Sequence, residues 1–266
     1  MADIIQIYNQ KGGVAKTTST IHLGGEFAKN FGKRVLLFDF DPLCALTKHI
    51  ACSETPNMYF TDLLKEYYLD DTEEDMHEAI CRTDFENIDI VPATREKMEK
   101  ATLDLANNKF FSNNGSLDPF IEQIEDEYDI VIFDSAAGAT DYNLMAMCIA
   151  NYLIIPTDDS MTSAESATLT IADMLKCKKR FNPGLDFIGI YMSRANGRRR
   201  VAKGLEALLG EQFKDKLIPV AIRDGAGVGN AGLDNSPICY CYPNDNIAKD
   251  YHNLAEYIIE YIGKGK

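Results

Sequence analysis

Short apolar runs and longer amphipathic stretches alternate along the whole chain. Several of the apolar runs are β-branched and lack polar alternation, which is typical of strands that are covered on both faces. The predicted strands are 4–8, 35–38, 88–91, 130–133, 152–155, 187–191 and 217–222. The stretches with helical period are 16–31, 58–67, 73–82, 117–127, 141–150, 161–179, 199–212 and 246–262. This alternation predicts an α/β fold, a mostly parallel twisted sheet flanked by helices on both faces.

The domain organisation follows from the same pattern. The sequence contains no internal repeat and no low-complexity linker, and the Asn- and Ser-rich stretch 107–116 is predicted to be one surface loop. We therefore expect residues 1–266 to form a single domain. Because the first strand begins at about residue 3, we expect no separate N-terminal DNA-binding domain.

Composition excludes several classes of protein. Hydrophobic residues make up 45% and charged residues 26% of the chain, which indicates a globular protein and not a disordered one. No apolar run approaches the ~18 residues of a membrane span, and the N-terminus lacks the pattern of a secretion signal. The seven cysteines include no CxxC pair, and Cys239 and Cys241 alone cannot supply four metal ligands. These observations predict a cytoplasmic protein with reduced thiols.

The segment 9-NQKGGVAKTTST-20 lies between the first predicted strand and the first predicted helix. A glycine-rich loop in this position can turn backbone N–H groups toward phosphate oxygens, and the helix that follows adds its positive end. Lys16 would neutralise the β- and γ-phosphates, and Thr17 would offer a hydroxyl to Mg²⁺. The usual pattern G-x-x-x-x-G-K-[ST] is not met, because Gln10 and Ala15 occupy its two glycine positions.

This segment resembles the deviant Walker A motif, KGGxxKT, of the ParA/MinD family of ATPases. The resemblance implies the P-loop NTPase fold, ATP and Mg²⁺ as cofactors, and ATP hydrolysis with weak intrinsic turnover. It also implies that Lys11 reaches the partner's nucleotide in an ATP-bound homodimer, so that Lys11 and Lys16 are both catalytic. The expected nucleotide-binding residues of the loop are Gly12, Gly13, Val14, Ala15, Lys16, Thr17 and Thr18.

Two carboxylates follow the second predicted strand in 35-VLLFDFDPLCALT-47. Residues at i and i+2 past a strand lie on the same side, here beside the phosphate loop. The segment resembles the Walker A′ motif of the family, D-x-D-P-Q. The resemblance implies that Asp41 orients or activates the attacking water and that Asp39 supports the metal shell. Leu43 stands in place of the usual glutamine.

A third carboxylate, Asp134, closes the apolar run in 128-YDIVIFDSAAGATD-141. A carboxylate at the carboxyl end of a strand is Walker B chemistry, in which it reaches Mg²⁺ through water. The expected metal residues are therefore Thr17, Asp39 and Asp134. The family usually continues with Thr-Pro-Pro, whereas Ser135, Ala136 and Ala137 stand here.

Weaker similarities concern the nucleobase. The segment 218–223, which includes Pro219, resembles the family segment whose backbone flanks the adenine. Ser193 and Arg194 stand where many relatives have an Asn-Arg pair that contacts the base. Serine cannot offer the same bidentate amide, so base selectivity is less well defined than phosphate binding.

Charge is distributed unevenly along the chain. The net charge is −14; residues 54–89 are strongly acidic, whereas residues 176–203 are basic. A cationic stretch without interleaved aromatic residues predicts contacts to DNA phosphates without sequence specificity; a solvated loop and helix face is the structural alternative. The candidate DNA-binding residues are Arg194, Arg198, Arg199, Arg200, Lys203 and Arg223.

The resemblance implies a DNA-partition ATPase that dimerises on Mg·ATP, binds nucleoid DNA nonspecifically and is released when a centromere-binding, ParB-like partner stimulates hydrolysis. The alternatives are a MinD-like, membrane-associated positioning ATPase and a ParA-like positioner of a protein cargo. The predicted last helix carries acidic residues around an apolar stripe, which favours docking on the body and makes a membrane partner unlikely. An iron–sulfur reductase would need a cysteine just after Asp134, and the sequence has none there. A tyrosine autokinase is suggested by the C-terminal tyrosines, but their helical spacing is better explained by packing.

Overall fold

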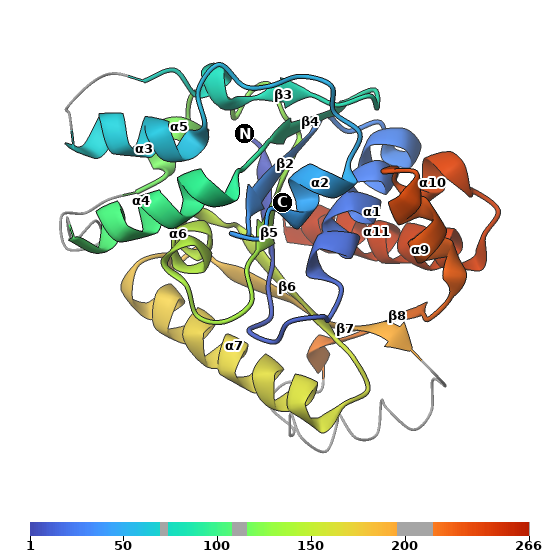
Figure 1. Cartoon of the computed structure of the whole chain (residues 1–266). Coiled ribbons are helices and arrows are strands. Elements are labelled where there is room, and N and C mark those ends of the chain that lie inside the picture. The colour runs from blue at the N-terminus through green and yellow to red at the C-terminus, as the bar shows by residue number, and fades with distance from the viewer. Residues whose placement is uncertain (70–73, 108–115, 196–214, 266) are drawn as a thin grey trace.

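The computed structural model describes residues 1–69, 74–107, 116–195 and 215–265. Its centre is an eight-stranded sheet with the order β3-β4-β2-β5-β1-β6-β7-β8, and among these described strands only β3 is antiparallel (Figure 1). The strands are β1 Asp3–Ile7, β2 Val35–Phe40, β3 Cys81–Arg82, β4 Ile88–Val91, β5 Ile130–Ser135, β6 Tyr152–Thr157, β7 Asp186–Ala195 and β8 Leu217–Arg223. The predicted α/β fold with a mostly parallel sheet is confirmed.

Helices cover both faces of the sheet and enclose two apolar cores. The helices are α1 Lys16–Phe31, α2 Ala45–His49, α3 Phe60–Leu69, α4 Arg95–Asn107, α5 Asp118–Ile121, α6 Asp141–Ile149, α7 Met161–Arg180, α9 Ala226–Leu233, α10 Ile238–Cys241 and α11 Asn246–Gly265. Alternate residues of β2 point to opposite sides: Phe38 packs with residues of α3 to α7, and Leu37 packs with residues of α1 and α9 to α11. This two-sided burial explains why the central strands are continuous apolar runs.

All seven predicted strands are present, and α1 has the predicted bounds. The predicted helix at 73–82 is wrong. In its place stand a 3₁₀ turn at Met76–Ala79, which Asp75 caps by accepting a hydrogen bond from the His77 N–H, and then strand β3. Hydrogen bonding to β4 stabilises this short segment more than a second helical turn would. The predicted helix at 117–127 is helical only over α5. The sequence did not predict α2, α4, α9 and α10. The predicted helix 199–212 lies outside the described residues.

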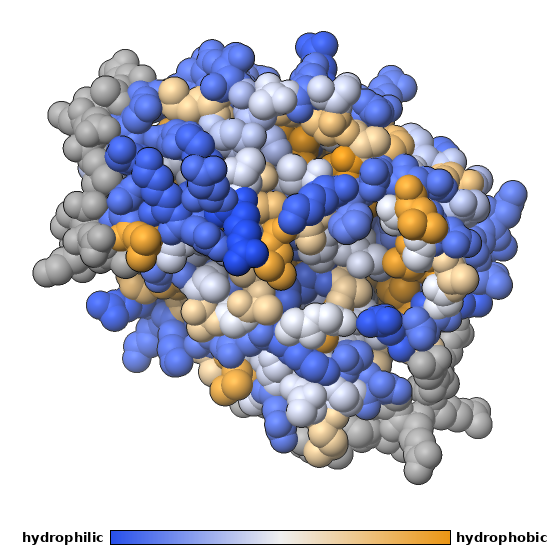
Figure 2. All heavy atoms as spheres, viewed as in Figure 1, coloured by the Kyte–Doolittle hydropathy of each residue, from blue (hydrophilic) through white to orange (hydrophobic). Residues whose placement is uncertain are grey.

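Hydrophilic side chains predominate on the face of the molecule shown in Figure 2. Apolar residues on this face form small separate groups. Within the described ranges, no helix is both long enough and apolar enough to cross a bilayer.

One buried histidine makes the stability of this fold depend on pH. His22 of α1 accepts a hydrogen bond at Nδ1 from the Ile238 N–H, and burial lowers its pKa from 6.5 to about 3. Below pH 6.5 the unfolded chain therefore binds a proton that the folded protein excludes, so stability falls as the pH falls. We expect the change from pH 7 to pH 5 to cost the wild type about 2 kcal/mol more than it costs His22→Gln, measured by urea unfolding. Equal losses in the two proteins would show that His22 is not the group responsible.

Candidate nucleotide-binding site

The phosphate loop connects the end of β1 to the start of α1, at the carboxyl edge of the sheet. Two of its residues have left-handed backbone conformations, Gly13 with φ 76° and Ala15 with φ 65°. The left-handed conformation costs an alanine about 1 kcal/mol or more, and it is held here at the position that a glycine occupies in the standard motif. No described side chain caps the first turn of α1, so its N–H groups are available to an anion.

A cavity of about 590 Å³ opens above this loop. One side is formed by the loop and by Asp41 and Ala137, and the other by the ends of β7 and β8 and by the start of α9. The lining residues are Gly12, Gly13, Ala15, Lys16, Thr17, Thr18, Asp41, Leu43, Ala45, Ala137, Ser193, Arg194, Ile222, Arg223, Asp224, Gly225, Ala226, Val228, Gly229 and Tyr251. The predicted phosphate-binding side and the predicted base-binding side therefore face one space of the size that a nucleotide requires.

Lys16 carries the positive charge at the floor of this cavity. Its side chain is buried, and its Nζ donates a hydrogen bond to the Lys11 carbonyl oxygen at 2.9 Å. Burial lowers the pKa of Lys16, although the nearby carboxylates of Asp134 and Asp41 act in the opposite direction. A buried ammonium group gains strongly from an anionic ligand, which is what the phosphates of a nucleotide would provide.

The predicted metal residues lie together at the ends of β2 and β5. Asp39 and Asp134 are paired in the sheet register, and Thr17 Oγ1 donates to Asp134 Oδ2 at 2.7 Å. Burial raises the pKa of Asp134 well above its ordinary value, and Asp39 raises it further. Asp134 Oδ1 is buried and has no hydrogen-bond partner among the described residues. A buried carboxylate oxygen without a partner, beside a threonine hydroxyl, fits Mg²⁺, which prefers oxygen ligands and keeps several waters.

Both carboxylate oxygens of Asp39 accept hydrogen bonds from its own chain. Its Oδ2 accepts hydrogen bonds from the N–H and the hydroxyl of Thr47, and its Oδ1 accepts one from the Asp41 N–H. Burial raises the pKa of Asp39 to about 6, against the effect of these hydrogen bonds. The arrangement holds the turn that carries Asp41, whose Oδ1 accepts from the Leu43 N–H at 2.9 Å. Leu43 itself is 62% exposed at the rim of the cavity.

Lys11 points toward the start of α7 in the structure. Its Nζ lies 2.9 Å from Asp158 Oδ2, 2.7 Å from Ser160 Oγ and 2.8 Å from Ser163 Oγ. Burial alone would raise the pKa of Asp158, but the hydrogen bonds from Ser160, Ser163 and Lys11 outweigh it and lower that pKa. We call Asp158, Ser160 and Ser163 the Lys11 cradle. Lys11 is thus held within its own chain.

The three predicted base-contact residues, Ser193, Arg194 and Pro219, have different surroundings. The Ser193 hydroxyl is buried and lies within hydrogen-bond distance of the carbonyl oxygens of Val14 and Thr157, so it holds the phosphate loop against β6 and β7. Arg194 is exposed, has φ 59°, and lies 3.8 Å from the Asp224 carboxylate at the cavity. Pro219 is exposed in the middle of β8, and the described cavity is lined by β8 only from Ile222 onward.

Of the predicted DNA-binding residues, the structure describes Arg194 and Arg223. Arg223 makes a bidentate pair with the buried carboxylate of Asp250 on α11, at 2.6 and 2.8 Å, and this pairing raises the pKa of Arg223. That geometry makes Arg223 a joint between β8 and α11. The positions of Arg198, Arg199, Arg200 and Lys203 lie outside the described residues.

Sequence reasoning missed the Lys11 cradle and Tyr251. The stretch 158–163 carries a recognisable helix-start signal, because Ser160 caps α7 by accepting from the Ser163 N–H. That local signal gives no indication that a lysine 147 positions away would be bound there. Tyr251 comes from α11 and lines the cavity, and its hydroxyl lies 3.3 Å from Ser19 Oγ.

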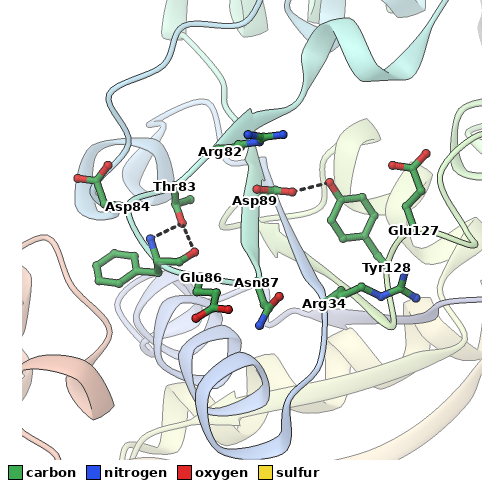
Figure 3. Close-up of a pocket in the computed structure, with 10 residues that line it drawn as sticks. Arg34, Arg82, Thr83, Asp84, Glu86, Asn87, Asp89, Glu127 and Tyr128 are labelled. Atoms are coloured by element: carbon green, nitrogen blue, oxygen red, sulfur yellow. Dashed lines mark hydrogen bonds between the residues drawn. The ribbon is translucent and has the colours of Figure 1, made fainter.

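A second cavity, of about 420 Å³, lies at the opposite edge of the sheet (Figure 3). Its lining combines two arginines with the carboxylates of Asp84, Glu86, Asp89 and Glu127. Arg34 is already bound to Asp129 at 3.0 Å, and Asp89 accepts a hydrogen bond from the Tyr128 hydroxyl. An excess of carboxylates repels phosphate, so this cavity is a poor candidate for the nucleotide.

Comparison with known proteins agrees with this geometry. A family model described as an AAA domain matches residues 2–187. The chain belongs to the AAA domain family. It is 28% identical to the chromosome-partitioning ATPase Soj of Thermus thermophilus, over 96% of this chain and 94% of that one. It is 26% identical to the sporulation initiation inhibitor protein Soj of Bacillus subtilis, over 96% and 98%.

Solved structures give the same fold. Cyanothece McdA without nucleotide superposes with a TM-score of 0.80 at 18% identity, covering 97% of this chain and all of that one. The septum site-determining protein MinD of Pyrococcus horikoshii, in complex with Mg-ADP, has a TM-score of 0.77 at 23% identity, over 100% and 99%. The expected ParA/MinD-type ATPase is confirmed by the family model and by the two Soj relatives. Its activity is ATP hydrolysis.

Proposed function

We propose that this ATPase binds Mg·ATP in the cavity above the phosphate loop and uses it to form a homodimer on nonspecific DNA. The observation that supports this most strongly is the convergence of Lys16, Thr17 and Asp134 at that loop, with one buried carboxylate oxygen left without a partner among the described residues. Two structural relatives, McdA and MinD, were solved with ATP and with Mg-ADP respectively.

The proposed roles follow from the geometry of the chain's own residues. The loop N–H groups and Lys16 hold the phosphates, Thr17 and Asp134 supply oxygen ligands, and Asp39 fixes the turn that carries Asp41. Bound Mg²⁺ would neutralise charge on the phosphates. Asp41 lines the cavity with one carboxylate oxygen engaged by the Leu43 N–H, so the other can orient the attacking water.

Asp41→Ala is expected to bind ATP normally and to hydrolyse it about 100-fold or more slowly, because the loop and Lys16 stay intact while the water loses its orienting group. Phosphate release under single-turnover conditions measures the rate, and a fluorescent ATP analogue measures binding. Thr94→Ala, a change outside the lining of the cavity, is the control for an unrelated substitution. Wild-type turnover in Asp41→Ala would remove Asp41 from the mechanism.

DNA as the dimer's partner is proposed from the basic stretch 176–203 on an otherwise acidic chain. Arg223 contributes less than the sequence suggests, because Asp250 already binds its guanidinium group. A membrane is disfavoured because the apolar stripe of α11, which includes Leu254, Ile258 and Ile262, is buried against the body. A ParB-like partner that stimulates hydrolysis belongs to the same proposal, by analogy with partition ATPases.

Changing Arg198, Arg199 and Arg200 together to Glu is expected to abolish ATP-dependent DNA binding and to leave ATP binding unchanged. For each phosphate that the protein no longer neutralises, the slope of log binding constant against log salt concentration becomes shallower by about one. Mobility shifts of duplex DNA with ATP and with ADP, over a salt series, measure the effect. The matched control makes the same charge change at Lys100, Lys249 and Lys264, which are exposed on α4 and α11. If the two triple variants bound DNA with the same affinity and the same salt dependence, Arg198, Arg199 and Arg200 would not be the DNA-binding residues.

A further inference from the structure

Two cysteine thiols face each other where α6 and α7 lie side by side (Figure 1). The Sγ atoms of Cys148 on α6 and Cys177 on α7 are 3.9 Å apart. Just after α7, the Asn182 side chain donates hydrogen bonds to the carbonyl oxygens of Met147 and Ala150 at 3.1 and 2.8 Å. These bonds hold the carboxyl ends of the two helices together, so the two thiols stay within reach of each other.

The separation of the two sulfur atoms is close to that of a covalent bridge. A disulfide bond is about 2 Å long, so the two Sγ atoms would have to approach each other by about 2 Å. Rotation of the two side chains about their Cα–Cβ bonds, with a small shift of the helix ends, covers such a distance. A bridge between Cys148 and Cys177 would join two helices that are separated in the chain by strand β6.

A small oxidant can reach this pair. Cys148 is partly exposed. Cys177 is buried, but it lines a cavity of about 330 Å³ that opens to solvent beside α6 and α7. Hydrogen peroxide is little larger than water, so the cavity gives it a path to the Cys177 sulfur.

The two thiols differ in their readiness to lose a proton. The hydrogen bond between them lowers the pKa of Cys177 and raises the pKa of Cys148. Burial raises the pKa of Cys44 to about 11 and the pKa of Cys239 to about 12. The thiolate is the form that reacts with oxidants, so Cys177 is better suited to react first than these three cysteines.

A second pair of neighbouring cysteines, Cys52 and Cys81, provides a comparison within the same chain. The Cys52 Sγ lies 3.2 Å from the carbonyl oxygen of Arg82, and burial raises the pKa of Cys52. Burial also raises the pKa of Cys81, to about 12. Both thiols are therefore protonated at neutral pH, and we expect this pair to remain reduced when Cys148 and Cys177 are oxidised.

We propose that Cys148 and Cys177 are a modification site, at which hydrogen peroxide forms a reversible disulfide that ties α6 to α7. The Cys177 thiolate attacks one peroxide oxygen, the O–O bond breaks, and the hydroxide that leaves takes up a proton to become water. The Cys148 sulfur then attacks the sulfur of the Cys177 sulfenic acid, the S–O bond breaks, and the hydroxyl group leaves as water with the Cys148 proton. Two thiols are oxidised to one disulfide, and one peroxide is reduced to two water molecules.

The disulfide stabilises the fold and does not depend on the proposed function. It closes a loop of about 30 residues and so restricts the unfolded chain, which raises the melting temperature by about 5 °C. It also secures the helix that supports the phosphate loop, because α7 carries the hydrogen-bond acceptor of the Gln10 side chain, Asp173.

Peptide mapping detects the bridge. The full-length protein is reduced with a phosphine, desalted, treated with hydrogen peroxide, alkylated under denaturing conditions and digested with trypsin. We expect two fewer alkylated cysteines per chain than in the untreated protein and a cross-linked peptide that joins Cys148 to Cys177, both reversed by the phosphine. The proposal is overturned if neither hydrogen peroxide nor the thiol oxidant diamide produces that peptide, or if a bridge between Cys52 and Cys81 forms in its place.

Single serine variants assign the roles of the two thiols. In Cys148→Ser, the oxidised Cys177 has no thiol to react with and is expected to be labelled as a sulfenic acid by dimedone, whereas Cys148 in Cys177→Ser is expected to stay unlabelled. Cys241→Ser changes another partly exposed cysteine, on α10, and should form the bridge like the wild type. Labelling of Cys148 in Cys177→Ser, with none of Cys177 in Cys148→Ser, would overturn the assignment of Cys177 as the first thiol to react. Mapping of the wild type is independent of how well the variants fold.

Thermal unfolding with and without the phosphine measures what the bridge does. We expect the oxidised wild type to melt about 5 °C above the reduced protein, and peroxide-treated Cys148→Ser to melt within about 1 °C of its own reduced form. A bridge that forms without raising the melting temperature of the wild type would overturn its stabilising role.

Discussion

Replacing Lys16 with alanine is expected to abolish ATP binding. The Lys16 ammonium group is buried at the floor of the cavity, where burial lowers its pKa and only the Lys11 carbonyl is within 3 Å of it among the described hydrogen bonds. Removing one partner of a buried charge pair costs about 2–5 kcal/mol, which corresponds to a loss of affinity of about 30-fold to several thousand-fold. Titration with a fluorescent ATP analogue, at constant Mg²⁺, measures the change.

The control for Lys16→Ala is Lys48→Ala. Lys48 lies in α2, close to the site, and its Nζ donates to the Leu43 carbonyl, but it is not one of the described residues that line the cavity. It should retain ATP affinity within about threefold. Thermal unfolding of both variants without ATP separates loss of binding from loss of folding. An ATP affinity for Lys16→Ala equal to that of Lys48→Ala would mean that the phosphates do not reach Lys16.

Replacing Lys11 with alanine is expected to leave ATP binding within a few-fold of wild type but to abolish ATP-dependent dimerisation and turnover. Lys11 is not among the described residues that line its own cavity, so its loss does not remove a contact to its own nucleotide. If Lys11 completes the site of a second subunit, the ATP-bound pair loses a charge-assisted hydrogen bond in each half, worth about 1.5–3 kcal/mol apiece. Molecular mass in solution with ATP and with ADP, with and without DNA, measures the effect.

Asp158→Asn provides the matched test, because it keeps Lys11 and weakens its cradle. Lys11 must leave Asp158, Ser160 and Ser163 before it can reach across an interface, and the Lys11–Asp158 pair is largely buried. We expect Asp158→Asn to dimerise at a several-fold lower protein concentration than the wild type with ATP. Opposite results for Lys11→Ala and Asp158→Asn would support transfer of the lysine. Wild-type dimerisation and turnover by Lys11→Ala would exclude a role for Lys11 in the partner's site.

Leu43 and the segment after Asp134 depart from the family pattern, and the structure explains part of this. Ala137 lies against the phosphate loop, because a Cβ built on Gly12 would stand 3.7 Å from the Ala137 Cβ. Asn143 donates to the carbonyl oxygens of Ala136 and Gly138 and so holds this segment without the two prolines of the family. Nothing in the structure of the single chain explains the exposed Leu43.

The sheet, the phosphate loop and the three carboxylates at the carboxyl ends of β2 and β5 are all encoded in local sequence patterns. Burial on both faces makes continuous apolar strands, and parallel strands bring residues at their carboxyl ends to one edge. That is why sequence patterns could place Lys16, Thr17, Asp39, Asp41 and Asp134 at one edge of the sheet, where the structure has them. The helix prediction for 73–82 was wrong because the conformation of its end depends on pairing with β4, which lies outside that segment.

Only the tertiary structure determines which groups are contacted by Lys11, Ser193 and Arg223, because those contacts depend on how helices and strands pack. Their partners, Asp158, Val14 and Asp250, lie 147, 179 and 27 positions away, and no periodicity or spacing encodes such pairs. Each pair satisfies a charge or a hydroxyl that folding removes from water, so it depends on where those elements meet.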